Sequence, residues 1–588
     1  MAHASVQAGF NGLNRHATRD EPKLNSWALI SLAALVGLPL LASFLAPLLA
    51  RGDRRRAGRL SVCAQWLDLL AAAAVLAIAL RAPPTAVFTF HAGALALTLD
   101  HLSAVVAALV AAISLVVHVY ARRYMIEEPG YVRFFALLDA MTAVILWLVV
   151  AGDLLSLLAA WFLVGVFLYA LLGHDTTRIA SGRYALWTWI TYRIGDLPLL
   201  GAVLLLWRGY GTLSLAEIFS RAAQGPTPQF AGIDVPVLAA LLVAVAAFAR
   251  SAQFPLHIWL PYTMDGPTPV SALMHAGIVN AGGFLFNRFA PLFPHAGMVL
   301  HLTVAVGLVT ALLGSALMLT QNDIKKTLGY STMGQMGFMV MECGLGAFSL
   351  AVYHLIAHGL FKATLFLGSG SVIGQARHDD GVPADDIYTF VVVRRPRRTA
   401  RLPWLAAVAI TVLVPLVVLA LSHQTVSPGL PQRQGALVLL FFGWVTGAQV
   451  FLSTHKLDTE SPWRTMGLVM FSFLIVVMGY TVIGHVFDDF LLPDRMLAEA
   501  IYESASIDAL AFDIIAVAVT VALVAAWVVN FYAQETRMQG RHGGSWNRAY
   551  LRIYGLVSRE FHIPAVWSWS ADRILSGSRR MNGWLRWL

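Results

Sequence analysis

The chain has 588 residues, of which 58% are hydrophobic and 12% are charged, and its formal net charge is +9. Soluble domains carry about 25% charged residues, so this composition excludes an ordinary soluble protein. Apolar runs of 18 or more residues recur along nearly the whole chain, which is typical of membrane-spanning helices. A β-barrel is excluded as well, because barrel strands are segments of about ten residues with alternating polarity.

The first 25 residues include Arg15, Arg19 and Lys23 and have no apolar core, so they do not resemble a cleaved signal peptide. We expect residues 1–25 to form a soluble, flexible tail. An all-α polytopic membrane protein with about 15 transmembrane helices is predicted after it. The predicted spans begin near Trp27, Val62, Ser103, Phe134, Leu154, Ala185, Val235, Val270, Val299, Lys326, Ala347, Leu402, Gly435, Met466 and Phe512.

Four segments follow the tail. Residues 26–375 form the predicted ion-conducting transmembrane core, and within them residues 100–375, with short connections that pack neighbouring spans antiparallel, are the predicted functional unit. Residues 376–401 are charged and interrupted by proline, which predicts a cytoplasmic loop, and residues 402–532 hold further spans. Residues 533–588 mix Trp and Tyr with Arg, which predicts either amphipathic helices on the cytoplasmic membrane face or a strut that docks a partner.

Basic residues cluster in the odd-numbered connections between the predicted spans. By the positive-inside rule, this places the N-terminus outside and the C-terminus in the cytoplasm. The positive charge is thus explained by topology and by affinity for anionic membrane lipids, and nothing in it calls for nucleic acid. The residues concerned are Arg51, Arg54, Arg55, Arg56, Arg59, Arg122, Arg123, Arg178, Arg183, Lys325, Lys326, Arg394, Arg395, Arg397, Arg398 and Arg401.

The sixth predicted span contains an acid and a base near its middle. Arg193 and Asp196 are three residues apart, so they can pair on one helix face. One interpretation is a neutralised structural contact. The other is a pair that sets the charge along an ion path, because ionisable groups within the membrane usually face a bundle interior and mark such a path.

Residues 249–277 predict a helix that breaks within the membrane. Arg250 lies inside an apolar span and is followed by four prolines, at Pro255, Pro261, Pro267 and Pro269. Proline removes a backbone donor and clashes with the preceding turn, and broken helices are where transporters place ion sites. The alternative is that Arg250 snorkels and the prolines only end the helix near the interface.

Three ionisable residues recur at four-residue intervals in the otherwise uncharged run 347–374. On a helix, His354, His358 and Lys362 share one stripe, and His275 follows the proline segment, where it can link Arg250 to that stripe or simply pack. Histidine titrates near neutral pH, which favours a proton wire. The alternative, two zinc ligands on one helix, lacks an obvious third ligand, and the two cysteines, Cys63 and Cys343, have no metal-ligand spacing. No metal and no cofactor are predicted.

Long strings of this sequence resemble the antiporter-like subunits of the respiratory NADH dehydrogenase complex and the Mrp sodium/proton antiporters. The strings are WLPYTMDGPTPVSALMHAG (259–277), QNDIKKTLGYSTMGQMGFM (321–339), YHLIAHGLFKATLFLGSGSVI (353–373) and the run that starts at Val119. The resemblance covers roughly residues 95–380. It implies an antiporter-like fold of broken helices, in which lysines, histidines and a glutamate relay protons at mid-membrane.

The sequence departs from those pumps at three places. Their glutamate that follows a tryptophan is absent here, because Trp161 is followed by Phe162. Arg250 stands where they have a lysine, and arginine does not exchange its proton. Residues 402–485 hold no counterpart of their second half-channel. One branch of this superfamily with a reduced second half is the membrane subunit of the DAB inorganic-carbon accumulation complex, and the present sequence resembles this branch most.

This resemblance implies a bacterial inner-membrane transport subunit that conducts H+ or Na+ and energises a cytoplasmic partner, and not an enzyme itself. The implied partner is a zinc-containing subunit like a β-carbonic anhydrase, of the DabA type, which converts CO2 to bicarbonate. The implied pathway contains Arg250, His275, His354, His358 and Lys362, with Arg193 and Asp196 as the charge-setting pair. The alternatives are a proton-pumping subunit of a respiratory complex, an Mrp-type antiporter, and an inert membrane anchor.

Overall fold

A computed structural model describes residues 21–378, apart from short gaps, and two shorter parts nearer the C-terminus. The described residues are 21–50, 53–83, 87–92, 95–175, 178–263, 266–318, 320–321, 323–378, 486–506 and 554–585, together with the single residues 467, 471, 482, 514 and 552. Within them, nine helices are long and apolar enough to cross a membrane. The chain is therefore a polytopic helical membrane protein.

The helices up to residue 378 run in the order in which the sequence predicts them. They are α2 (Glu21–Leu49), α3 (Arg55–Arg81), α4 (His101–Tyr124), α5 (Tyr131–Val149), α6 (Leu154–Leu172), α7 (Ile179–Tyr210), α8 (Leu215–Gln224), α9 (Val235–Arg250), α10 (Trp259–Tyr262), α11 (Thr268–Leu273), α12 (Ala281–Arg288), α13 (Gly297–Met318), α14 (Ile324–Gly344) and α15 (Phe348–His378). Short helices of other kinds are η2 (Met274–Ile278) and η3 (Ala290–His295).

Eleven of the predicted span starts, from Trp27 to Ala347, lie in one of these helices or directly before it. The starts near Leu402, Gly435, Met466 and Phe512 lie outside the described residues, as do residues 1–20 of the predicted tail (1–25) and residues 379–401 of the predicted loop (376–401). The total of about 15 spans therefore stays a prediction. The orientation of the termini and the division of the chain into segments stay predictions too.

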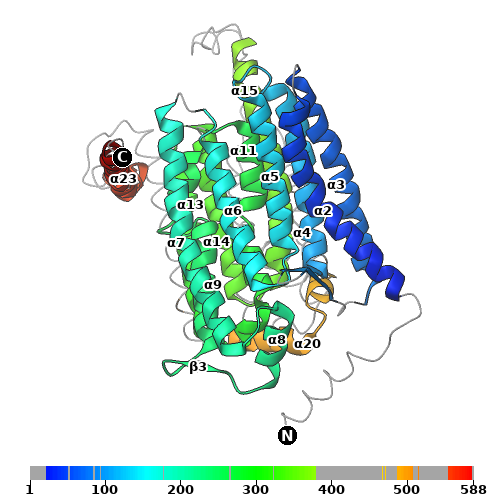
Figure 1. Cartoon of the computed structure of the whole chain (residues 1–588). Helices are drawn as coiled ribbons and strands as arrows, with labels where there is room; N and C mark the ends of the chain where they lie inside the picture. Colours follow the sequence, from blue (N-terminus) through cyan, green and yellow to red (C-terminus); the bar gives the residue numbers. More distant parts are fainter. Residues whose placement is uncertain are drawn as a thin grey trace.

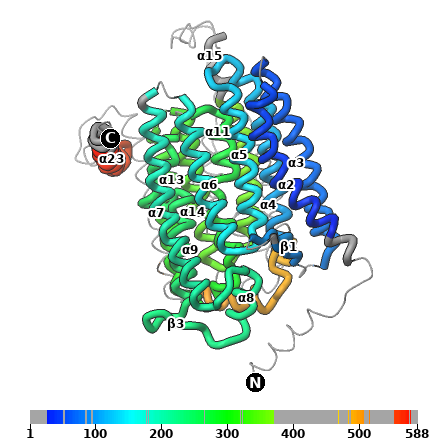
Figure 2. Tube along the Cα trace, viewed as in Figure 1, coloured from blue at the N-terminus to red at the C-terminus, as the bar shows by residue number. Residues whose placement is uncertain are grey.

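The long helices form one bundle, with α2 and α3 along one edge and α7 and α9 at the opposite edge (Figure 1). At one end of the bundle lie α8, α20 (Arg495–Ser504) and two short hairpins (Figure 2). The hairpins pair β1 (Phe88–Ala92) with β2 (Leu95–Leu99) and β3 (Gln229–Phe230) with β4 (Ile233–Asp234), both antiparallel. They lie in the connections before α4 and α9, and Leu99 of β2 is part of the apolar core.

Helices α13 and α14 pack with their backbones in contact. A Cβ atom added at Gly337 would collide with the backbone of Ala311, and one added at Gly314 would collide with the backbone of Gly334. Small residues allow the two helices to approach this closely. In lipid there is no hydrophobic driving force between helices, so close packing of this kind holds them together. The consequence is a fixed position for α14 and for the polar side chains that it carries.

The C-terminal part of the chain folds back onto the bundle. Helices η5 (Glu560–His562) and α23 (Ile563–Leu585) lie beside α7 (Figure 1). The Glu560 side chain is 2% exposed, with Oε1 2.6 Å from Lys326 Nζ, and Oε2 accepts a hydrogen bond from Tyr262 Oη at 3.0 Å. This segment is thus anchored beside α10, while its predicted amphipathic character and cytoplasmic side stay predictions.

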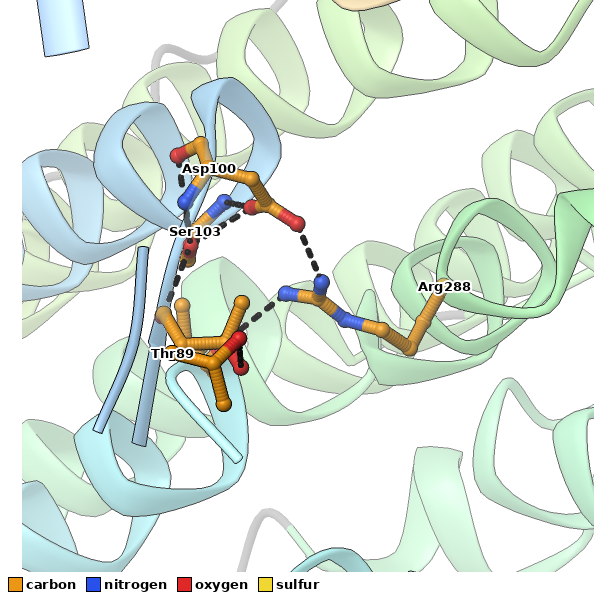
Figure 3. Close-up of polar contacts among 6 residues, drawn as sticks. Thr89, Asp100, Ser103 and Arg288 are labelled. Atoms are coloured by element: carbon orange, nitrogen blue, oxygen red, sulfur yellow. Dashed lines mark hydrogen bonds and ion pairs between the residues drawn. The ribbon is translucent and has the colours of Figure 1, made fainter. Parts of the chain in front are cut away.

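An ion pair joins the start of α4 to the end of α12 (Figure 3). Asp100 caps α4 by accepting a hydrogen bond from Ser103 N at 2.7 Å, and its other carboxylate oxygen pairs with Arg288. Arg288 also donates to Val149 O at 3.0 Å. Burial on its own would raise the pKa of Asp100, but Arg288 and Ser103 outweigh burial and hold this pKa below its usual range.

We expect Arg288→Ala to destabilise the protein by roughly 3–5 kcal/mol, because it leaves a largely buried carboxylate without its partner. A carboxyl whose pKa is lowered by folding stabilises the protein fully above its unfolded pKa of about 3.9, and this contribution is lost as the pH falls through the lower, folded pKa. Thermal unfolding in detergent between pH 7 and pH 3 measures both effects.

The matched control is Arg56→Ala, which removes an exposed partner of Asp53 at 3.9 Å. Such pairs contribute about 0–1 kcal/mol, so the control should unfold like the unmodified protein. Equal unfolding temperatures for Arg288→Ala and the control would contradict the assignment of Asp100 and Arg288 as a stabilising buried pair.

Candidate functional site

The helix that carries Arg250 stops within the bundle. α9 ends at Arg250, residues 251–258 are not helical, and the chain resumes helical geometry in α10, which begins at Trp259. Pro255 lies in the non-helical stretch and Pro261 lies inside α10. Missing proline donors and ring clashes account for this interruption. The freed backbone groups find other partners, since Trp259 Nε1 donates to Ala249 O at 3.2 Å.

The segment after the break contains a second irregularity. Pro267 directly precedes α11 and Pro269 lies in its first turn, where a missing backbone donor costs nothing. α11 then passes into the π-helical turn η2, which carries His275. Such turns are frequent at functional sites. His275 is therefore presented from a locally widened helix and not from a regular one.

Arg250 lies in a buried cluster of charges and aromatic rings. Its side chain is 1% exposed, and Nη2 donates to Trp161 O at 2.9 Å and contacts Asp196 Oδ1 at 3.3 Å. The guanidinium carbon lies 4.2 Å from the centre of the Trp161 ring and 4.0 Å from that of Tyr192. A desolvated cation is stabilised by such ring faces. Arg250 thus points into the bundle and does not snorkel.

Asp196 is shared between two arginines. Its Oδ2 lies 2.7 Å from Arg193 Nη2, one turn away on α7, and its Oδ1 faces Arg250 on α9. Arg193 is itself held over the rings of Phe162 and Trp189, at 3.9 and 4.1 Å from their centres. One carboxylate therefore balances two guanidinium groups, and the three predicted residues meet in one place. The carboxylate beside Arg250 comes from α7, whereas Phe162 stands at the position after Trp161.

The stripe on α15 faces polar groups of α14. His354 Nδ1 lies 3.1 Å from Glu342 Oε2, and its Nε2 lies 3.0 Å from Gln335 Oε1. Lys362 is 1% exposed, and its Nζ donates to Ser331 Oγ at 2.9 Å. The two helices thus form a ladder of polar pairs.

His358 lies between the ends of this ladder, and His275 lies beside its Lys362 end. Both ring nitrogens of His358 are buried and have no hydrogen-bond partner among the described residues. His358 interacts electrostatically with His354, Lys362 and His275, and the centres of the His354 and His358 rings are 6.3 Å apart. His275 stacks on Phe366 with ring centres 4.1 Å apart. Four of the predicted residues therefore form one connected group on η2 and α15.

The structure does not bring Arg250 and His275 into direct contact. Over the described part of the chain, the polar and aromatic partners of Arg250 are Asp196, Trp161 and Tyr192, whereas His275 contacts the α15 group. The predicted pathway residues thus fall into two buried clusters: the arginine cluster, Arg193, Asp196 and Arg250, and the histidine–lysine cluster, His275, His354, His358 and Lys362.

Sequence reasoning missed the partners that complete both clusters. Glu342 and Gln335 fix the two nitrogens of His354, and Tyr192 covers Arg250. Glu342 was detectable, because it is an acid inside an apolar run that directly precedes a short connection to α15. Tyr192 gave no comparable signal. Its role depends on how α7 packs against α9.

Family models match two parts of the chain. Residues 151–426 match "NADH:quinone oxidoreductase/Mrp antiporter, TM", and residues 90–135 match "NADH-Ubiquinone oxidoreductase (complex I), chain 5 N-terminus". A solved structure of the Mrp complex from Dietzia sp. aligns with 94% of this chain and 60% of that chain, at 24% identity and a TM-score of 0.55. An archaeal membrane-bound sulfane sulfur reductase aligns with 81% of this chain, at 18% identity and a TM-score of 0.56. The fold and its buried charges therefore define an antiporter-like membrane subunit.

Two curated relatives refine this class. "Probable inorganic carbon transporter subunit DabB1" of Halothiobacillus neapolitanus is 52% identical over 555 residues, which are 94% of this chain and 98% of that protein. "NAD(P)H-quinone oxidoreductase chain 5" of Synechocystis is 42% identical over 286 residues, which are 48% of this chain and 42% of that protein. The chain belongs to the NADH:quinone oxidoreductase/Mrp antiporter family, in its DabB-like branch. The resemblance predicted from the sequence is confirmed, and it extends well beyond residue 380.

Proposed function

We propose that this chain is the membrane subunit of an inorganic-carbon accumulation complex of a bacterial inner membrane. The observation that carries the proposal is the 52% identity, over nearly the full length of both chains, to a probable inorganic carbon transporter subunit. In this role the chain conducts protons, or less readily Na+, and energises a cytoplasmic zinc-containing partner like a carbonic anhydrase. The C-terminus lies on the partner's side and the N-terminus outside.

The histidine–lysine cluster supplies the exchangeable groups of this proposal. Glu342 and His354 form the first acid–base step, His358 the second, and Lys362 with His275 the third. Each imidazole can accept a proton on one nitrogen and release one from the other. Water between these side chains completes the contacts that exceed hydrogen-bond length. In this proposal, protons move along the length of α15.

The arginine cluster supplies fixed charge in this proposal. Arginine keeps its proton at every accessible pH, so Arg250 and Arg193 do not relay protons. Asp196 is the group in this cluster that can change its protonation state, and each change alters the net charge beside the helix break. A cation that moves along α15 is repelled by the excess positive charge of the arginine cluster. The two clusters are thereby coupled through their electrostatic field.

Proton pumping in a respiratory or Mrp-type complex is the second candidate. It is favoured by the family model over residues 151–426 and by the 42% identity to an NAD(P)H-quinone oxidoreductase chain. This chain spans less than half of that relative. Purification of the intact complex separates the candidates. A soluble zinc protein that co-purifies supports inorganic-carbon accumulation, whereas a ladder of redox subunits contradicts it.

To test whether a cation gradient supplies the energy, inorganic-carbon uptake is measured after the membrane gradients have been collapsed. In cells that express this chain with its partner, we expect a protonophore to reduce bicarbonate accumulation to the level of cells without the chain. A sodium ionophore serves as the parallel measurement for Na+. Undiminished accumulation after both treatments would refute conduction as the energy source and would favour the inert anchor.

A further inference from the structure

Helix α3 carries a line of polar residues that faces the bundle and takes no part in either cluster described above. Ser61, Gln65 and Asp68 are spaced at i, i+4 and i+7, so they lie on one face, and all three are 0% exposed. Asp68 is the central residue of α3 (Arg55–Arg81), and at 1.5 Å per residue it lies about 20 Å from either end. A carboxyl group therefore sits at the middle of a span.

The line on α3 contacts a buried acid–base pair. Asp139 on α5 accepts hydrogen bonds from Ser61 Oγ at 2.5 Å and from Gln65 Nε2 at 2.9 Å. Its Oδ1 also lies 3.1 Å from His118 Nε2 on α4, and neither side chain is exposed. Three helices thus converge on one carboxylate.

The hydrogen bonds around His118 place a proton on its Nδ1. Thr142 donates its hydroxyl proton to Leu138 O, so the Ser114 hydroxyl proton is the one that lies between Ser114 and Thr142. His118 Nδ1 lies 2.7 Å from Ser114 O, which only accepts, and therefore Nδ1 carries a proton. Nε2 faces a carboxylate oxygen that also only accepts. The 3.1 Å contact lacks hydrogen-bond geometry, so Asp139 is held by its hydrogen bonds from Ser61 and Gln65 and has the His118 imidazole as a further neighbour.

Asp68 has no such partner. Neither of its carboxylate oxygens, nor Gln65 Oε1 one turn away, has a hydrogen-bond partner among the described residues. In the part of the chain that the structure describes, the ionisable groups that face it are Asp139 from α5, with which it interacts electrostatically, and behind that residue His118 from α4. The apolar part of α2, Ser26–Leu49, contains no ionisable residue. An isolated carboxylate in such surroundings would carry a desolvation cost that a bound proton removes.

We propose that Asp68, with Gln65, Asp139 and His118, forms a second proton-binding site on α3, α4 and α5. One proton from water forms an O–H bond on the Asp68 carboxylate, which thereby becomes neutral, and Gln65 Oε1, one turn away on α3, is an acceptor without a partner among the described residues. Release reverses this step and returns the proton to water. The site lies on different helices from the histidine–lysine cluster. The inference concerns proton binding to this chain alone and does not rest on the proposed function.

Infrared difference spectroscopy of the full chain in detergent tests the proposal directly. A protonated carboxyl group has a carbonyl stretch that ionised carboxylates lack and that shifts in heavy water. At neutral pH, we expect the unmodified protein to show such a band that Asp68→Asn loses, and that also disappears as the pH is raised. The amide of asparagine has nearly the shape of the protonated acid, so this variant should keep its fold.

Asp53→Asn is the matched control, because it removes an exposed, ion-paired carboxylate that precedes the same helix. Its spectrum should keep the band. A band that Asp68→Asn leaves unchanged would overturn the proposal. So would a band that appears in the unmodified protein only after removal of Na+, because the resting occupant of Asp68 would then be a metal cation and not a proton.

Discussion

Replacing Lys362 or His358 with alanine is expected to abolish cation-driven transport while the complex still assembles. Lys362 Nζ is buried and bonded to Ser331, and His358 stands between His354 and Lys362 on the same helical stripe. Removal of a positioned proton-transfer group typically lowers a rate by roughly 10²–10⁴-fold. Bicarbonate accumulation in cells, measured beside the amount of assembled complex, reports both outcomes.

Two further variants serve as controls. One tests whether Lys362 is needed for proton exchange or only for its positive charge, and the other tests whether the loss of any histidine would have the effect of losing His358. Lys362→Arg keeps a positive charge but holds its proton, so it should be nearly as inactive as Lys362→Ala. His301→Ala removes an imidazole on α13 that contacts Ser506 O outside the stripe, and it should retain normal uptake. Normal uptake in Lys362→Ala and His358→Ala, with the complex intact, would indicate that the chain serves only as a membrane anchor.

The second large effect is expected at Asp196. Asp196→Asn leaves Arg193 and Arg250 facing each other without a carboxylate between them. Breaking a buried pair by removing one partner costs roughly 3–5 kcal/mol, so the variant should unfold at a markedly lower temperature and lose transport. Thermal unfolding in detergent and uptake in cells measure the two consequences.

A compensating variant tests whether charge is the cause. Adding Arg193→Gln to Asp196→Asn returns the net charge of the arginine cluster to its original value of one, and it should recover part of the lost stability. The control Asp572→Asn removes an exposed partner of Arg183, at 3.4 Å, and should change neither property. If the double variant were no more stable than Asp196→Asn, charge balance would not explain the contacts of Asp196.

Much of the fold could be predicted from the sequence because the relevant signals are local. Apolar runs mark the helices, the prolines around Arg250 mark the break, and the four-residue spacing of His354, His358 and Lys362 marks one helix face. The pair Arg193 and Asp196 was visible for the same reason. In each case the interacting residues belong to one helix or one short segment.

The rest could not be predicted because it depends on which helices touch. The contact of Glu342 with His354 joins two helices, and the contact of Asp139 with Gln65 joins residues 74 positions apart. In the sequence, Asp68 is one acidic residue in an apolar run. That its carboxylate lacks a hydrogen-bond partner is evident only from the packing of α2, α4 and α5 around it. Packing between helices, and not propensity within them, decides these sites.

The anchor of the C-terminal segment has a consequence for the order in which the protein is made. Tyr262 and Glu560 are 298 residues apart, and synthesis at about 5–20 residues per second separates them by roughly 15–60 s. During that interval Lys326 is inserted without its carboxylate. The Lys326 ammonium therefore has no carboxylate partner until Glu560 has been synthesised, and a chain that ended before Glu560 would lack this ion pair.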